Sequence, residues 1–267
     1  MVMGFSENIQ MSMEYANHAF KSFGSWFVLI LLYAVMFAGT ALMILGIIIL
    51  ATALFATTSP ELLATGGMMI PDAELAVLAS ISGSMMVLGI IVTILSSIFI
   101  YGITMRVYRG GELVLNHWGK MFVEGLLGLI IIFIYMIPYT ILSTLLALGP
   151  MDNPAYLIIV GIIIPTILLI VSIMVAMMGI IKFAKEGHFG AAFHLKELFS
   201  LIANIGWFKY LGYWILISLI VGVVELVFIC IPLVGLIMFV VAMPFIMIVT
   251  ARFYANIYES ALPAAAE

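Results

Sequence analysis

The chain has 267 residues, of which 66% are hydrophobic and only 8% are charged, and its mean hydropathy is +1.34. Soluble globular domains contain about 25% charged residues. A water-soluble protein of this size has too little interior to hide so much apolar surface. The composition therefore excludes a soluble enzyme, and nine Lys and Arg against thirteen Asp and Glu exclude a basic nucleic-acid-binding domain.

The cysteine content and the first twenty residues exclude further kinds of site and segment. The single cysteine, Cys230, excludes an intramolecular disulfide and any metal centre built from several cysteines. Glu7 and Glu14 lie in the first twenty residues, and no basic residue precedes Lys21. A cleaved signal peptide has the opposite pattern, so we expect none.

Six segments are long and apolar enough to cross a bilayer as helices, since about 30 Å of hydrocarbon takes about 20 residues. These apolar runs lack the alternation of a membrane β-strand. The predicted fold is therefore an all-α integral membrane protein with six transmembrane helices. The predicted spans are 26–55, 80–105, 126–148, 155–181, 208–231 and 233–255.

The distribution of charge predicts an orientation. The connections after spans one, three and five contain Glu61, Asp72, Glu74 and Asp152 but no Lys or Arg. Because cytoplasmic loops are enriched in Lys and Arg, we expect a multi-pass protein of the cell membrane with both termini in the cytoplasm. The cations at the N-terminus, after spans two and four, and near the C-terminus are Lys21, Arg106, Arg109, Lys120, Lys182, Lys185, Lys196, Lys209 and Arg252.

Three segments on the predicted cytoplasmic side have the pattern of amphipathic helices. The second covers residues 116–125 and the third covers 189–205. Such helices lie in the membrane interface with their apolar face toward lipid. In the first segment, apolar residues recur at steps of three and four along one helical stripe: Ile9, Met13, Ala16, Phe20 and Phe23.

Each amphipathic segment precedes two spans, which predicts one membrane domain over 1–267, made of three hairpin units. The units are 5–110, 113–187 and 189–260. An even number of spans in each unit makes the repeats parallel, so the three amphipathic helices are expected on one side of the membrane.

Several stretches of the chain together carry a family resemblance: Arg106–Gly125, Tyr135–Pro138, the run from Phe189 through Ala192 and Phe193 to Tyr210, Ala251–Tyr254 and Glu259–Ala261. They resemble an uncharacterised archaeal and bacterial membrane family, the domain-of-unknown-function family 4013. Members typically have a proline where Val114 or Leu115 stands here. The resemblance supports the membrane fold, implies an archaeal source and transfers no catalytic residue.

No motif in the sequence predicts catalysis or cofactor binding. All four histidines lie on the predicted cytoplasmic side and both aspartates on the other, which separates the members of a Ser-His-Asp relay by a bilayer. A pair of His117 with Glu124 is conceivable, since the two lie seven residues apart on one helical face. HExxH, P-loop and dinucleotide-binding patterns are absent from the sequence. We therefore expect no catalytic, cofactor or metal site. The less favoured alternative is a pseudo-symmetric metal site, because the histidines occur about once per unit.

Two groups of ionisable residues are candidate functional residues. Glu225 is the one clearly intramembrane carboxylate, and such groups are costly in lipid. It would function in a pathway, or simply reach the outer interface. The cations at the cytoplasmic ends of the spans would contact lipid headgroups or another anion, or would serve only to set topology. They are Arg106, Arg109, Lys182, Lys185 and Arg252.

The sequence leaves two hypotheses for function. The first is a non-catalytic membrane protein that interacts with lipid or scaffolds a cytoplasmic protein partner through its amphipathic helices. The alternative is a transporter or channel for a small solute or ion, with Glu225 near its outer mouth. Membrane lipids are the expected partners in both, and nucleic acid in neither.

Overall fold

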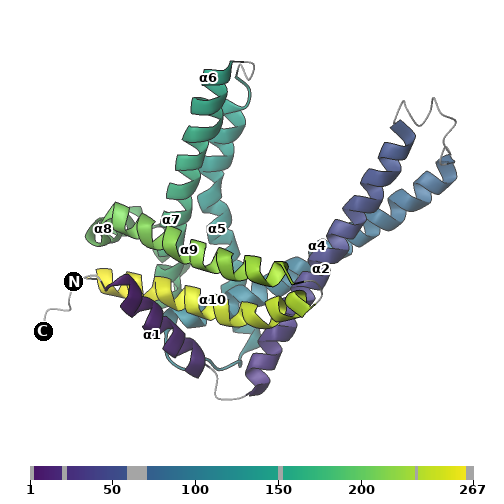
Figure 1. Ribbon diagram of the computed structural model, residues 1–267. Coiled ribbons are helices and arrows are strands. Elements are labelled where there is room, and N and C mark those ends of the chain that lie inside the picture. The colour runs from purple at the N-terminus through teal and green to yellow at the C-terminus, as the bar shows by residue number, and fades with distance from the viewer. Residues whose placement is uncertain (1–2, 20–22, 59–70, 150–152, 232–233, 263–267) are drawn as a thin grey trace, which may run out of the picture. The chain divides into compact units, whose positions relative to one another are not determined.

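The computed structural model describes residues 3–19, 23–58, 71–149, 153–231 and 234–262, and within these ranges the regular elements are helices, with no strand (Figure 1). Six of the helical segments are long and apolar enough to cross a membrane, which confirms the predicted number of spans. The long elements are α2 (Phe23–Thr58), α4 (Asp72–Arg109), α5 (Trp118–Leu146), α7 (Ile164–Glu186), α9 (Trp207–Ile229) and α10 (Val234–Ala261).

The fourth span combines three elements in one continuous stretch. It begins with the single turn α6 (Pro154–Tyr156), continues as a π-helical stretch over Leu157–Ile163, and becomes α7. Asn153 caps its start, because the Asn153 side chain accepts hydrogen bonds from the backbone N–H groups of Ala155 and Tyr156.

Several helices extend beyond the predicted spans at their polar ends. α4 and α7 continue to Arg109 and Glu186, and α5 begins at Trp118. Hydropathy detects only the part of a helix that matches hydrocarbon, whereas the backbone hydrogen bonds continue into the polar region. Four of the cations predicted to follow spans two and four therefore lie on the last turns of α4 and α7, namely Arg106, Arg109, Lys182 and Lys185.

The chain forms two compact units. One comprises residues 27–100, where α2 and α4 pack closely as a hairpin. Side chains added at Gly39, Gly46 or Gly89 would collide with the facing helix, in each case including its backbone. The hydroxyls of Thr40 and Thr93 lie 3.4 Å apart across this contact. Glycine thus permits the close approach of these two helices.

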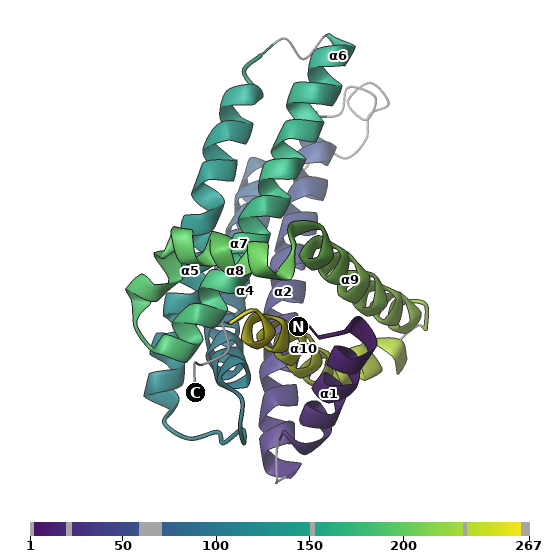
Figure 2. The ribbon, with the colours of Figure 1, turned by 90° about the vertical axis from the view of Figure 1, so that its left-hand side faces the viewer.

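The other unit comprises residues 1–26 and 101–267. Its core lies at the C-terminal ends of α4, α7 and α10, where fully buried side chains include Met105, Met178, Ile181, Ile248 and Phe253. The pairs α5–α7 and α9–α10 lie side by side in Figures 1 and 2. Three short helices complete this unit: α1 (Phe5–His18), the 3-10 helix η2 (Phe189–Phe193) and α8 (Leu195–Ile205).

The prediction of a separate amphipathic helix at 116–125 is wrong. Residues 112–117 have no regular structure, and α5 then runs without interruption from Trp118 to Leu146. The physical reason is that no proline lies between Trp118 and Pro138, so the polar first turns simply continue into the apolar span.

The other two short helices use faces that differ from the predicted apolar stripes. In α1, Ala16 is buried but Met13 is 44% exposed, and the buried residues beside Ala16 are polar. Phe23 already belongs to α2, and Phe20 lies outside the described residues. In the third segment Ala192 and Ile202 are buried within the protein, whereas Phe199 is exposed. These helices therefore use part of their apolar surface to pack on other helices.

Candidate functional site: three polar joints

The predicted cations lie at the C-terminal ends of α4, α7 and α10, where each binds other protein groups. We call the polar contact between such a helix end and another helical segment a joint. The first joint links α4 to the start of α5, the second links α7 to α8, and the third links α10 to α1.

In the first joint, Arg109 forms a bidentate pair with Glu124. The guanidinium nitrogens lie 3.0 and 2.7 Å from the two carboxylate oxygens, and the Glu124 side chain is only 10% exposed. Arg109 Nε also donates to the Ala184 carbonyl at 2.6 Å, which ties α4 to α7. Planar fork-to-carboxylate geometry is the strongest form of this contact, so Arg109 fixes three helices at one point.

Arg106 holds the loop between α4 and α5. It donates to the Asn116 carbonyl at 2.5 Å and to the Asn116 side-chain oxygen at 3.2 Å, and it also donates to the Val114 carbonyl. The loop itself begins with Gly110 and Gly111, both at positive φ. Arg106 therefore acts in this structure as a loop clamp.

Two glycines permit the close approaches at the first joint. A side chain at Gly102 would overlap the backbone of Met121, so α4 and α5 touch there. Gly110 has φ of 79°, which favours glycine, and the Arg252 guanidinium lies beside it. Gly102 therefore leaves no room for a side chain, whereas Gly110 is favoured by its backbone conformation.

The second joint has the same spacing along the chain as the first. Lys182 donates to Glu197, and this pair is separated by 15 residues, like Arg109 and Glu124. The Lys182 side chain is 4% exposed, and its ammonium also lies 3.6 Å from Glu186 and 3.5 Å from His194 Nδ1. Two carboxylates thus neutralise one buried cation, which would otherwise be strongly unfavourable.

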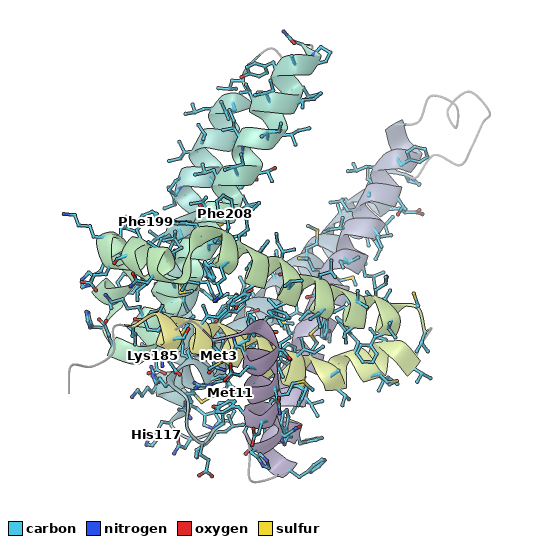
Figure 3. The ribbon with its side chains drawn as sticks, turned by 60° about the vertical axis from the view of Figure 1, so that its left-hand side comes forward. Met3, Met11, His117, Lys185, Phe199 and Phe208 are labelled. Atoms are coloured by element: carbon cyan, nitrogen blue, oxygen red, sulfur yellow. The ribbon has the colours of Figure 1, made fainter. Side chains whose placement is uncertain are left out.

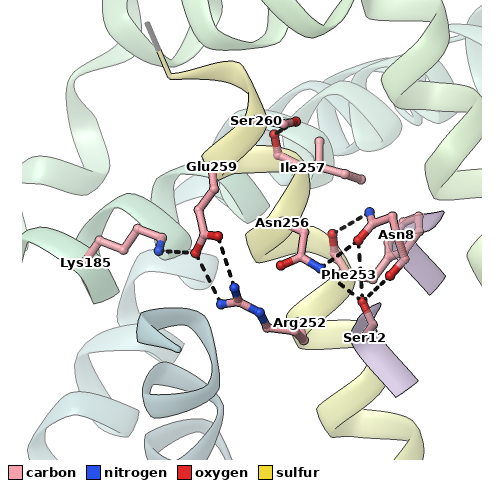
Figure 4. A network of polar contacts seen from close by, with 9 residues as sticks. All are labelled: Asn8, Ser12, Lys185, Arg252, Phe253, Asn256, Ile257, Glu259 and Ser260. Atoms are coloured by element: carbon pink, nitrogen blue, oxygen red, sulfur yellow. Dashed lines mark hydrogen bonds and ion pairs between the residues drawn. The ribbon is translucent and has the colours of Figure 1, made fainter. Parts of the chain in front are cut away.

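The third joint contains buried amides and a hydroxyl in place of charges (Figure 4). Asn256 donates to Asn8 Oδ1 at 2.8 Å and to the Ser12 hydroxyl at 3.3 Å. Asn8 donates in turn to the Phe253 carbonyl at 3.0 Å. All three side chains are buried, so each needs these partners.

Glu259 on α10 is a carboxylate shared by two cations, and it links α10 to α7. Glu259 accepts from Lys185 at 2.6 Å and from Arg252 at 3.2 and 3.0 Å (Figure 4). Arg252 also lies over the Tyr15 ring, 5.3 Å from its centroid. All five predicted cations are therefore bound to protein acceptors, and whether they also bind lipid phosphates stays a prediction.

Tyr15 differs from the buried polar residues of the joints, because its hydroxyl is not hydrogen-bonded to another described residue. Its hydroxyl is buried and has no hydrogen-bond partner among the described residues. Burial raises the pKa of Tyr15 above 10.0, and the nearby charge of Arg252 offsets part of that rise.

The remaining candidate residues do not assemble into a reactive site. Glu225 is half-buried in α9, and no hydrogen bond or ion pair links it to another described residue. His117 is an exposed residue at φ of 53° before α5, and Glu124 pairs with Arg109. Across the described ranges, no group of three or more His, Cys, Asp or Glu is placed to hold a metal ion.

Sequence reasoning missed the partners of the cations. Glu124, Glu197 and Glu259 were not singled out as structural residues, nor were Asn8 and Ser12. A signal was present, because a cation followed 15 residues later by glutamate occurs at the ends of the first two predicted units. The signal for the third joint is weaker, since its residues lie at opposite ends of the chain.

Residues 85–250, well over half of the chain, match the family described as "Protein of unknown function (DUF4013)". The chain belongs to the DUF4013 family. The match covers the first and second joints and ends just before Arg252. α1 lies outside the DUF4013 match, so the family assignment says nothing of the third joint. No curated protein and no solved structure matches the chain significantly.

Proposed function

We propose that this DUF4013 protein is a non-catalytic scaffold of the cell membrane that contacts lipid and a protein partner through its short cytoplasmic helices. The carrying observation is that the ionised side chains at the helix ends neutralise one another. Arg109 with Glu124 and Lys185 with Glu259 join helices, and Arg252 neutralises Glu259 from within α10. Ion pairs of this kind hold the helices together, and the side chains that form them are not free to act on a substrate.

The joints also support the three hairpin units 5–110, 113–187 and 189–260. In the first two joints the end of one hairpin binds the segment that starts the next, at the same spacing of 15 residues. In the third, the last hairpin binds α1, the segment that precedes the first hairpin. The Lys and Arg residues favour placing both termini on the cytoplasmic side.

The turn between α8 and α9 is the surface best suited to lipid contact. Phe208 is 90% exposed, and the Phe199 ring lies 5.7 Å from that of Trp207. Figure 3 shows Phe199 and Phe208 at this turn. Lys196 and Lys209 flank the aromatic residues in the sequence. Aromatic rings combined with lysines are typical of segments that lie at an anionic membrane interface.

A second contact for lipid headgroups is a hollow of about 240 Å³ beside the first joint. Arg106 and Arg109 line it together with Glu112 and Asn116. Each guanidinium has five donors, and the contacts described above use only some of them, so a phosphate oxygen could be accepted there. The acidic neighbour makes this contact weaker than the α8–α9 turn.

The alternative function, a solute or ion pathway, has less support. A pathway needs polar groups arranged along the membrane interior. Glu225 has no hydrogen-bond or ion-pair partner among the described residues.

The proposal is tested with the full chain in liposomes. We expect no ion or small-solute flux above that of empty liposomes, and no change in this result for Glu225→Gln. A variant whose sole tryptophan is Trp207 should be quenched by brominated lipids, more strongly in anionic than in neutral membranes. Phe199→Ser with Phe208→Ser should reduce that quenching, whereas Phe133→Ser on α5 should not. Flux that depends on Glu225 would overturn the scaffold proposal in favour of a pathway.

A further inference from the structure

The outward face of α1 is a surface that the joints leave unused. The inward face carries Asn8, Ser12 and Ala16, all fully buried against α10. The side chains on the opposite side of the helix are exposed to solvent, and α1 shares no residue with the DUF4013 match. The outward residues are Ser6, Glu7, Gln10, Glu14 and Asn17.

An apolar edge borders this polar face. Ile9 is half-buried and Met13 is largely exposed, one helical turn further along. Together with Ser6, Gln10, Glu14 and Asn17 they line a hollow of about 560 Å³. A shallow surface with two apolar residues beside polar ones is suited to the side of another helix.

The charge of α1 favours one class of occupant. The helix Phe5–His18 contains Glu7 and Glu14, seven residues apart on one face, and no Lys or Arg. Neither glutamate forms an ion pair with another described residue. A cytoplasmic leaflet rich in anionic lipid would repel this face, whereas the lysines near the α8–α9 turn suit such a leaflet. A cationic protein segment has the complementary charge.

We infer that the outward face of α1 is a docking surface for a basic amphipathic helix of a partner protein. The apolar side of that helix would contact Ile9 and Met13, and its Lys or Arg residues would face Glu7 and Glu14. This inference rests on the proposed scaffold function, which places α1 on the cytoplasmic side, and it names the class of partner.

The test uses the full chain in nanodiscs of neutral lipid and two labelled 18-residue peptides. One is built from Leu and Lys with the lysines on one helical face, and the other has Glu in place of each Lys. We expect the Lys peptide to bind above the background of empty nanodiscs, more weakly as salt rises, and the Glu peptide not to bind.

Three variants locate the binding surface. Glu14→Lys should weaken binding of the Lys peptide about tenfold, equivalent to about 1.4 kcal/mol, through charge reversal at the surface. Met13→Ser should weaken it without a change in charge. Glu74→Lys, the same charge reversal on exposed residue 74 of α4, should leave the affinity unchanged.

Equal affinity for Glu14→Lys and Glu74→Lys, or no binding of the Lys peptide, would overturn the inference. Hydrogen-exchange protection of α1 in anionic but not neutral nanodiscs would overturn it as well, because α1 would then lie on the bilayer. None of these results affects the outcome of the liposome flux or Trp207 quenching experiments. An incorrect partner class can therefore be distinguished from an incorrect scaffold proposal.

Discussion

At the scale of single residues, Gly102 determines how closely α4 approaches α5. A side chain at this position would overlap the Met121 backbone, and backbone cannot move aside as a flexible side chain can. Tyr15 shows the opposite situation, a buried hydroxyl that contributes no hydrogen bond. Gly102 is therefore required by the close helix contact, whereas the buried hydroxyl of Tyr15 lowers the stability of the fold.

Gly102→Ala should destabilise the protein by about 1–3 kcal/mol, because overpacking forces the two helices apart. The free energy or midpoint of unfolding in detergent measures this loss. Gly212→Ala is the matched control, since a side chain there meets only open space, and it should be neutral or slightly stabilising. Equal destabilisation by the two variants would contradict the assigned contact.

Tyr15→Phe should be neutral or stabilising at pH 7, by up to about 1 kcal/mol, because it removes an unsatisfied buried hydroxyl. The raised pKa of Tyr15 also has a consequence at alkaline pH. The neutral phenol is favoured in the folded state, so its contribution is complete below about pH 10, the pKa of an unfolded tyrosine, and is lost as pH rises above it. Unfolding midpoints of the two proteins from pH 8 to 11 should therefore diverge above pH 10, with Tyr15→Phe losing less stability.

At the scale of helical elements, the two charged joints share a spacing but differ in burial. Glu124 is 10% exposed and its partner Arg109 makes a bidentate contact, whereas Glu197 is 62% exposed. Lys182 also keeps Glu186 as a second carboxylate at 3.6 Å. Water reaches the Glu197 carboxylate and competes for it, so the first joint should hold its helices more strongly.

Glu124→Gln should destabilise the protein by about 1–3 kcal/mol, because Arg109 loses its charged partner at a largely buried carboxylate. Glu197→Gln should cost less, about 0–1 kcal/mol, because Glu197 is itself exposed and Lys182 keeps Glu186 as a partner. Unfolding of both variants in the same detergent gives the comparison. A larger loss for Glu197→Gln would show that burial of the carboxylate does not set the strength of a joint.

At the scale of the whole molecule, the proposed orientation places the N-terminal end of α4 outside and the N-terminal end of α5 on the cytoplasmic side of the membrane. In a Cys230→Ser background, a cysteine in place of Lys120 should react with an impermeant maleimide only from the cytoplasmic side. A cysteine in place of Glu74 should react only from outside. Both positions are exposed. Labelling of both from one side would contradict the orientation expected from the Lys and Arg residues.

Local composition was sufficient for the number and approximate position of the membrane helices. Each span is recognised within its own 20 or so residues, because the cost of placing polar groups in hydrocarbon applies to every residue of the span. The family was recognised for the same reason, from contiguous stretches such as Arg106–Gly125. The start of α5 was misjudged, since amphipathic periodicity does not show whether a helix continues into the next span.

The composition of 66% apolar and 8% charged residues, with the order of the apolar runs, thus determined by itself that this is a six-span helical membrane protein. Only the tertiary structure decided what the few charges do. Arg109 meets Glu124 across 15 residues, and Asn256 meets Asn8 across 248. Periodicity describes the faces of one helix, but the choice among its faces depends on the neighbour that packs there. α10 packs on the face of α1 that carries Asn8 and Ser12, because Asn256 and the Phe253 carbonyl satisfy the buried polar groups of that face.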